Sequence, residues 1–514
     1  MSASDAPIEV SLSLVSHTNA GKTTLARTLL GRDVGEVRDQ AHVTDRVDEF
    51  VLLASDHGDR LSLWDTPGFG DSHRLARRLA LSGNPIGWLL SEVWDRFRDR
   101  PLWSSQQAIR HVRDRADAVL YLVNAAEDPD DATYVQAEMR ILAWVGKPVI
   151  VLLNQLGAPR EPALEAAERA RWSAHLGGHA IVRTVLALDA FARCWVQESV
   201  LLGAVADLLP AGQQAGFARL RAAWRARHEA VFEASVRALV QGLARAALDS
   251  EPLVGGGLAQ QLRAAGARVG IGHAAPDGAR EHAMRALAGR LDADLRQSTN
   301  EMIAAHGLRG QARDEILARV ASQYTVSRRV DEGRAAILGG LISGSLVGLK
   351  ADLATGGLTL GGGLLAGGLI GALSAAGLAR GYNRIRGTKQ DSLAWADEVL
   401  DDCVVAALLA YLVVAHFGRG RGEWDSPAAP AHWEPTVRDV LAARRAELSA
   451  LWQRRQPAPA DEAERAARQE SLAAALQACL AGCAREVLER LYPDSPLTGP
   501  SSARSSARRP TWSG

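Results

Sequence analysis

The sequence contains little cysteine, little lysine and no net charge. Its four cysteines are too few and too scattered for a disulfide-stapled secreted scaffold, and no two of them form a CxxC pair. The 59 basic and 59 acidic residues leave a formal net charge of +0, which argues against binding of nucleic acid through bulk charge. The N-terminus lacks a basic segment followed by an apolar one, so we expect no secretory signal and a cytoplasmic protein.

Lysine is scarce enough to be informative where it occurs. Only four of the 59 basic residues are lysine, and the other 55 are arginine. A position that keeps lysine in such a chain is a candidate for chemistry that needs a compact ammonium group. The four are Lys22, Lys147, Lys350 and Lys389.

Apolar, β-branched runs alternate with helix-like stretches in the N-terminal part of the chain. This alternation predicts an α/β domain over 1–195, with a mostly parallel sheet and helices on both faces. A long connector at about 69–116, which carries Trp88, Trp94 and Trp103, indicates an insertion of one or two helices. The predicted strands are 9–15, 49–54, 60–65, 117–124, 147–153 and 181–187.

After residue 195 strand signals end, and helical spacing of alanine, arginine, leucine and glutamate predicts a largely α-helical C-terminal region. Its predicted parts are a helical region at 196–334, a glycine-rich apolar hairpin with a following helix at 335–417, C-terminal helices with linkers at 418–492, and a disordered tail at 493–514.

The first predicted strand leads directly into a phosphate-binding loop. Residues 16–24 read Ser-His-Thr-Asn-Ala-Gly-Lys-Thr-Thr and precede an apolar helical pattern. In this order of strand, loop and helix, backbone N–H groups at the helix N-terminus hold phosphate oxygens. We expect Lys22 to reach the terminal phosphates and the Thr23 hydroxyl to ligate Mg²⁺. Ser16 replaces the first glycine of the usual GxxxxGK(S/T) pattern. The other expected nucleotide contacts are Ser16, Asn19, Ala20, Gly21 and Thr24.

A second motif follows the third predicted strand and reads Asp65-Thr66-Pro67-Gly68. At a strand end Asp65 can hold the Mg²⁺ shell, and the Gly68 amide can bond the terminal phosphate. Thr44, in the polar connector between the two motifs, is the switch candidate. It would close over the metal in the triphosphate state and release after hydrolysis, and an ordinary loop threonine is the alternative.

The fifth predicted strand ends where the nucleotide base would be recognised. A guanine-specific loop has the pattern Asn-Lys-x-Asp, in which the aspartate accepts from both guanine N–H groups. Here Asn154 is kept, Gln155 follows it, and Gly157 stands at the aspartate position. Such paired hydrogen bonds contribute roughly a few kcal/mol of discrimination, so their absence weakens the expectation of strict GTP selectivity. Asp189, beyond the last predicted strand, is a candidate substitute.

The phosphate loop with Asn19, the segment at 65–68 and the strand end at Asn154 together resemble the Era-like branch of P-loop GTPases, in the TRAFAC class. The chain looks like a bacterial group of these proteins whose helical C-terminal domain has no assigned function. The motifs cover about the first 195 residues, and the resemblance implies a switch domain that binds GTP or GDP with Mg²⁺. In Era-like relatives an asparagine at the position of Asn19 helps to coordinate K⁺, and a loop-stabilising side chain is the alternative for this chain.

Turnover is expected to be slow without help. Ras-like enzymes place a glutamine just after the glycine of the second motif to orient water, and here that residue is Phe69. A potassium ion near Asn19 would supply charge where an arginine finger otherwise acts. The expected catalytic residues are Lys22, Thr44 and Asn19, and the expected metal ligands are Thr23, Thr44 and Asp65.

The glycine-rich stretch at 335–379 leaves two alternatives open. Glycines at spacing four allow close helix packing in either a protein core or a bilayer. Residues 353–379 contain no charge, and as a helix this segment would be about 40 Å long, enough to cross ~30 Å of hydrocarbon. The apolar run at 403–417 is short for spanning. We favour a soluble hairpin. The alternative, membrane contact, would place the protein at or in the inner membrane.

The sequence therefore favours a nucleotide switch that hydrolyses GTP to GDP and phosphate and acts through its helical C-terminal region. The alternatives are a membrane-associating scaffold with structural nucleotide binding, and a P-loop ATPase that Gly157 would suit. The expected partners are a guanine nucleotide and an unidentified protein effector, with a homodimer left open. Nothing in the sequence points to nucleic acid.

Overall fold

The computed structural model describes residues 6–17, 20–31, 48–69, 71–81, 83–91, 100–190, 193–252, 277–308, 382–385, 392–416, 430–455 and 461–495. The chain forms two compact units. The N-terminal unit comprises Met1–His228, His416–Trp424 and Leu488–Gly514, and the C-terminal unit comprises Glu229–Ala415 and Asp425–Val487.

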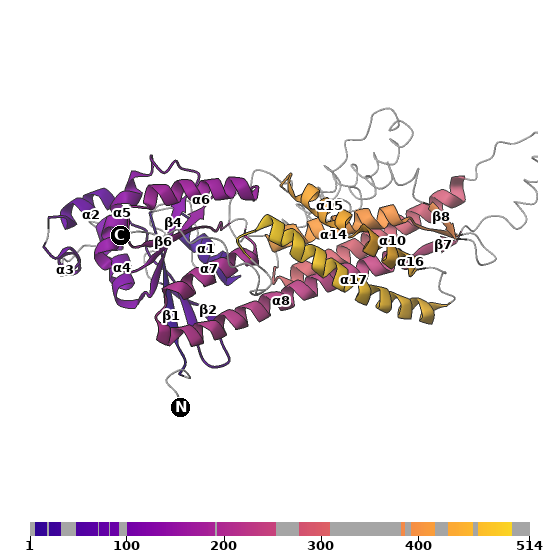
Figure 1. Ribbon diagram of the computed structural model, residues 1–514, viewed down its shortest axis with the longest axis horizontal. Coiled ribbons are helices and arrows are strands. Elements are labelled where there is room, and N and C mark those ends of the chain that lie inside the picture. Colours follow the sequence, from indigo (N-terminus) through magenta and orange to yellow (C-terminus); the bar gives the residue numbers. More distant parts are fainter. Residues whose placement is uncertain are drawn as a thin grey trace, which may run out of the picture. The chain divides into compact units, whose positions relative to one another are not determined.

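A six-stranded sheet forms the centre of the N-terminal unit (Figure 1). The strand order is β2-β3-β1-β4-β5-β6, and all neighbours are parallel except β2 and β3. The predicted α/β class is thus confirmed, and every predicted strand is present within two residues of its expected ends. The strands are β1 (Glu9–Ser16), β2 (Asp48–Ala54), β3 (Arg60–Asp65), β4 (Ala118–Asn124), β5 (Val149–Asn154) and β6 (Val182–Ala187).

Strands β4 and β5 read as nearly continuous apolar runs because helices cover both faces of the sheet. All six residues of β5 are buried, as are all residues of β4 before Asn124. The helices of this unit are α1 (Lys22–Leu30), α2 (Ser72–Leu79), α3 (Pro85–Ser91), α4 (Arg100–Arg115), α5 (Thr133–Val145), α6 (Pro162–Leu176), α7 (Trp195–Leu208) and the first part of α8 (Ala211–Leu248).

The expected insertion contains α2, α3 and α4, one helix more than the sequence indicated. Helix α2 begins at an aspartate cap, in which an Asp71 carboxylate oxygen accepts from the Arg74 amide. It packs mainly against α5, and Leu75 and Leu79 are fully buried in one core with Phe69. The insertion therefore holds the segment that follows β3.

Two short segments from late in the chain complete the N-terminal unit. His416 Nε2 and the Tyr492 hydroxyl lie 2.6 Å apart, and both side chains are buried. Arg169 on α6 forms an ion pair with Asp494 over 2.5 Å. The N-terminal unit is therefore discontinuous in sequence.

The C-terminal unit is built from long helices around a core that includes Phe232 and Tyr411, whose rings meet edge to face with centroids 5.7 Å apart. Arg485 pairs with Glu229 and Glu233 and also lies over the Phe232 ring. Besides the end of α8, the helices are α10 (Asp277–Ala305), α14 (Asp397–Ala415), α15 (Trp433–Ala443), α16 (Arg445–Gln453) and most of α17 (Glu462–Leu491).

The C-terminal unit also contains a small antiparallel sheet, which corrects the expectation that strands end at residue 195. Its strand order is β7-β9-β8. Strands of three or four residues are too short to show the period-two alternation by which strands are recognised in sequence. They are β7 (Ser250–Pro252), β8 (Tyr382–Ile385) and β9 (Ser392–Trp395).

The glycine-rich stretch at 335–379 lies outside the described residues. The second apolar run does not: it forms α14, whose residues from Cys403 to Ala415 are all buried within the C-terminal unit. Among the described helices α17 alone is long and apolar enough to cross a membrane, and half of its most apolar window is buried. Core helices of soluble proteins meet the same criterion, so α17 adds little to the membrane alternative.

Candidate functional site

The carboxyl ends of β1, β3 and β5 carry the motif residues. Ser16 is the last residue of β1, Asp65 the last of β3 and Asn154 the last of β5. β3 and β4 flank β1, and β5 follows β4. Because ligands of parallel α/β sheets bind beyond the carboxyl ends of the strands, this edge is the candidate site.

The phosphate loop is closed by the side chain of Lys22 at the start of α1. The Lys22 ammonium donates to the Ser16 hydroxyl over 2.9 Å, and that hydroxyl donates to the His17 carbonyl over 2.5 Å. Ser16 is the last residue of β1, and its φ is not positive. Because glycine is needed where φ is positive, serine can occupy the first position of this loop. Thr24, in the same first turn of α1, is buried.

Gly21 is required by its backbone and by its surroundings. It adopts φ 88°, and a Cβ at this position would lie 2.6 Å from the Asn154 side-chain nitrogen. That nitrogen donates to the Ala20 carbonyl over 2.8 Å, and the Asn154 side-chain oxygen accepts from the Ala190 amide over 2.8 Å. Asn154 therefore joins three segments: the phosphate loop, the end of β5 and the segment after β6.

Asp65 has the environment of a metal-associated carboxylate. Its Oδ2 atom accepts from the Thr23 hydroxyl over 2.5 Å. Its Oδ1 atom is buried and has no hydrogen-bond partner among the described residues. A buried, unsatisfied carboxylate oxygen beside a threonine hydroxyl fits a hard divalent cation such as Mg²⁺. No cluster of three His, Cys, Asp or Glu side chains suited to a metal occurs in the described ranges, so phosphate oxygens and water would supply the other ligands.

Burial is the largest influence on the pKa values of Lys22 and Asp65 at this edge of the sheet. It lowers the pKa of the Lys22 amine, while the carboxylates of Asp65 and Glu138 raise it. It likewise raises the pKa of Asp65, against the opposing effects of Lys22 and the Thr23 hydroxyl. A cation bound here would stabilise the ionised carboxylate of Asp65. A bound polyphosphate would stabilise the protonated amine of Lys22.

The segment after β3 is fixed to the phosphate loop. The Thr66 hydroxyl donates to the Leu14 carbonyl over 2.5 Å, and the Phe69 amide donates to the Ser16 carbonyl over 2.9 Å. Gly68, between them, is buried. The Phe69 ring is fully buried in the core, so this side chain does not reach towards the site in place of the expected glutamine.

The loop after Asn154 has an unusual backbone. Gln155 adopts φ 61°, the left-handed region in which residues other than glycine are uncommon, and Gly157 adopts φ 81°. The Leu156 amide donates to Asp189 over 2.5 Å, so this carboxylate caps the loop. The Arg160 guanidinium donates back to the Leu156 carbonyl over 2.9 Å.

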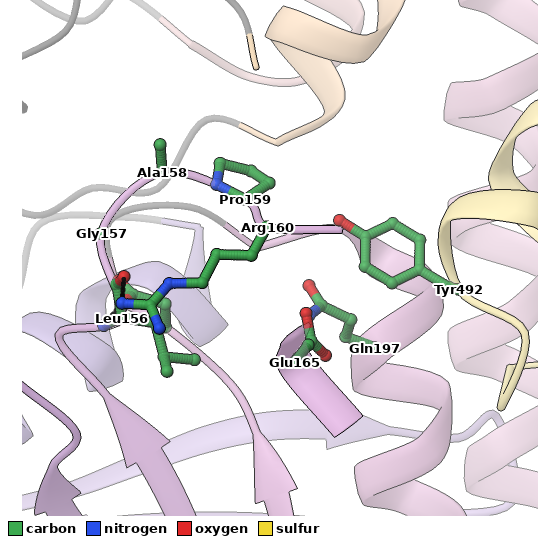
Figure 2. Close-up of a pocket in the computed structure, with 9 residues that line it drawn as sticks. Leu156, Gly157, Ala158, Pro159, Arg160, Glu165, Gln197 and Tyr492 are labelled. Atoms are coloured by element: carbon green, nitrogen blue, oxygen red, sulfur yellow. Dashed lines mark hydrogen bonds between the residues drawn. The ribbon is translucent and has the colours of Figure 1, made fainter. Parts of the chain in front are cut away.

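Figure 2 shows a small pocket beside this loop. The loop forms one wall of the pocket, and Glu165 of α6, Gln197 of α7 and Tyr492 form the other. Gly157 lies on the loop wall with open space where a Cβ would be. The position that carries the base-reading aspartate in the guanine pattern therefore has room for a side chain, but its φ of 81° would strain a residue other than glycine.

Two predicted site residues, Asn19 and Thr44, lie outside the described residues. One buried group of this site was not predicted from the sequence. Glu138 on α5 is fully buried and accepts from His17, Ser72 and Tyr121. The available signal was a glutamate on the apolar face that carries Val135 and Met139.

The strand-loop-helix with Lys22, the Thr23 and Asp65 pair and the six-stranded sheet define a P-loop nucleotide-binding domain. Residues 11–155 match the family described as "50S ribosome-binding GTPase". Residues 321–478 match a second family, described as a domain of unknown function. The predicted combination of an Era-like P-loop GTPase domain and a separate C-terminal domain is thus confirmed.

One curated relative is the GTPase Der of Deinococcus deserti, which is 28% identical over 149 residues. That match covers 29% of this chain and 27% of the relative, so the chain shares about a quarter of the relative's length.

The chain is also similar to solved structures. An Era variant of Aquifex aeolicus bound to GDP and aluminium fluoride is 19% identical, with a TM-score of 0.29 over 40% of this chain and 57% of that one. Era bound to MgGDPNP and a segment of 16S ribosomal RNA is 19% identical, with a TM-score of 0.26 over 36% and 51%. The bacterial selenocysteine-specific elongation factor is 15% identical, with a TM-score of 0.24 over 35% and 26%.

Proposed function

We propose that this protein is a nucleotide switch that binds GTP with Mg²⁺ and hydrolyses it to GDP and phosphate. One observation carries the proposal: the Thr23 hydroxyl bonds one oxygen of Asp65, while the other oxygen is buried without a partner in the described part of the chain. The match of residues 11–155 to a GTPase family supports the choice of nucleotide.

The chain's own residues divide the work. The Lys22 ammonium would leave the Ser16 hydroxyl and bind the terminal phosphates, and the amides at the start of α1 would hold the neighbouring oxygens. Thr23 and Asp65 would hold Mg²⁺, which supplies charge neutralisation on the phosphates. Thr44 would contribute as the switch residue, and Gly68 as the amide donor to the terminal phosphate.

Intrinsic turnover is expected to be slow because the buried Phe69 ring cannot orient a water molecule. We propose that K⁺, held with the help of Asn19, supplies the missing charge. The substitution Asn19→Ala should then abolish stimulation of phosphate release by K⁺ over Na⁺. An equal rate loss in both salts would contradict the role in ion binding.

We propose that the C-terminal unit is the effector region and responds to the nucleotide state. The proposed partner is a protein, because neither charge nor motif in this chain points to RNA. One Era structure contains 16S ribosomal RNA, as its name states. Self-association, and membrane contact through 335–379, stay predictions from sequence. Fractionation after expression tests membrane contact, and light scattering with each nucleotide tests self-association.

The central test is phosphate release from GTP and from ATP, with Mg²⁺ and either K⁺ or Na⁺. Loss of GTP turnover in Lys22→Ala, with turnover kept in Lys147→Ala, would support the proposed nucleotide switch. The two variants are matched because each removes one of the four lysines: Lys22 lies at the site, and Lys147 lies in the turn after α5. Binding without any turnover would favour the scaffold alternative. Displacement of labelled GDP by excess ATP would favour the ATPase alternative.

A further inference from the structure

Glu138 lies fully buried in the middle of α5, between core residues Val135 and Leu142. Burial of a carboxylate is strongly unfavourable unless hydrogen bonds satisfy its oxygens. This carboxylate meets that requirement through donors on three other segments. Its position inside the core therefore reflects a specific network.

The donors divide between the two oxygens of the carboxylate. The Ser72 hydroxyl, at the first residue of α2, donates to Oε1 over 2.5 Å. His17 Nδ1, just after β1, lies 2.8 Å from the same oxygen. The Tyr121 hydroxyl, from the middle of β4, donates to Oε2 over 2.6 Å. Oε1 thus joins two segments of the nucleotide site, and Oε2 is held by the sheet.

Both segments on the Oε1 side belong to the proposed switch. His17 is the first loop residue after Ser16, and it forms a parallel bridge with Phe69. Ser72 begins the helix that follows the Gly68 and Phe69 segment. The Tyr134 ring stacks on His17 with centroids 4.4 Å apart, which fixes the imidazole. The phosphate loop, Phe69, Ser72 and Glu138 therefore form a closed ring of contacts.

The charge of Glu138 also acts on the phosphate-binding lysine. Burial lowers the pKa of the Lys22 amine, and the carboxylates of Asp65 and Glu138 both raise it. The effect of Glu138 on Lys22 is electrostatic and involves no hydrogen bond between these two described side chains.

We propose that Glu138 is a positioning residue for GTP hydrolysis, acting through His17 and Ser72 to hold the start of α2 against the phosphate loop. The inference rests on the proposed function. It implies that the segment containing Gly68 moves together with the loop, because both are fixed to one carboxylate oxygen. Loss of that oxygen's charge should impair the chemical step more than nucleotide binding.

The test compares three variants of the full chain. Glu138→Gln removes the charge at nearly constant shape, Ser72→Ala removes a donor to Oε1, and Tyr121→Phe removes a donor to Oε2 of the same carboxylate. We expect kcat to fall about tenfold in Glu138→Gln and Ser72→Ala, with KM and labelled-GDP affinity changed by less than about threefold. Tyr121→Phe should lower the thermal midpoint while kcat stays within about twofold of wild type.

The outcomes separate this inference from the proposed function. If wild-type protein releases phosphate from GTP and kcat is unchanged in Glu138→Gln and Ser72→Ala, Glu138 is only a core residue and the inference fails alone. Equal kcat losses in Ser72→Ala and Tyr121→Phe would also overturn it, because the effect would then follow stability. If Glu138→Gln does not fold, the comparison of kcat between Ser72→Ala and Tyr121→Phe decides whether the inference holds. If wild-type protein shows no turnover, both proposals fail.

Discussion

The side-chain amide of Asn154 holds the Ala20 carbonyl with its nitrogen and the Ala190 amide with its oxygen, each over 2.8 Å. One fully buried side chain thereby joins two loops that are distant in sequence. The spacing between the phosphate loop and the segment after β6 therefore depends on this side chain.

The substitution Asn154→Ala should therefore reduce both stability and nucleotide affinity. Two buried backbone groups lose their partners, which costs about 2 kcal/mol or more of unfolding free energy. Denaturant unfolding and labelled-nucleotide titration measure the two effects. Asn124→Ala is a matched control, because Asn124 ends β4 in register with Asn154 but bonds only to nearby Ala126 and Glu127. An equal affinity loss in the control would argue against the specific role of Asn154.

Removal of the Asp65 carboxylate should uncouple nucleotide binding from Mg²⁺. In Asp65→Ala we expect affinity for GTP with Mg²⁺ to fall to the level that wild-type protein shows in chelator, because the unpartnered oxygen that fits the cation is gone. Calorimetry with and without Mg²⁺ measures this difference. Asp48→Ala removes an exposed carboxylate from the residue paired with Asp65 in β2, and it should keep the Mg²⁺ dependence.

A carboxylate at position 157 should sharpen selectivity for GTP over ATP. Gly157 has φ 81° and open space at the Cβ position, and aspartate tolerates left-handed backbone better than most residues. We expect Gly157→Asp to raise the GTP to ATP affinity ratio by about 10- to 100-fold. Gly146→Asp is the control, since Gly146 has φ 78° and equally open space at the end of α5. An unchanged ratio in Gly157→Asp would mean that the base lies elsewhere.

Stability should depend on pH through His111. Its ring lies 4.5 Å from that of Trp64, and burial, followed by the nearby Arg115 cation, lowers its pKa to about 4. Because the folded protein disfavours the protonated ring, the stabilisation is present above about pH 6.5 and is lost as pH falls towards 4. As the pH is lowered across this range, the unfolding midpoint of His111→Gln should decline less than that of the wild-type protein. His57→Gln, at an exposed position, should follow wild type.

The sequence predicted the sheet well because the signals of its strands are local. Strand β5 is a continuous apolar run, and β1 and β3 alternate apolar residues with serine. Both patterns are typical of strands, so the strands that end at Ser16, Asp65 and Asn154 could be recognised from the sequence. The position of Glu138 could not be predicted in this way. Helical spacing places this residue on a face of α5, but the donors that make its burial favourable lie 17 to 121 residues away.

Contacts between residues that are distant in sequence were also not predicted outside the nucleotide site. His416 and Tyr492, which are hydrogen-bond partners, lie 76 residues apart in the sequence, and neither residue is distinctive in its local pattern. Strand β7 also pairs with a distant segment, β9, whereas β8 and β9 are neighbours in the sequence. Such contacts depend on how helices pack, which periodicity within one helix does not specify.

Because Tyr492 and Asp494 belong to the N-terminal unit, that unit contains both the first and the last described parts of the polypeptide. At about 5–20 residues per second, a translating ribosome delivers these residues roughly 25 to 100 seconds after Lys22. A nascent chain can complete the phosphate loop long before His416 gains its partner. Final closure of the nucleotide-binding unit is thus a late event in biosynthesis, and a chain shortened at its C-terminus would never reach it.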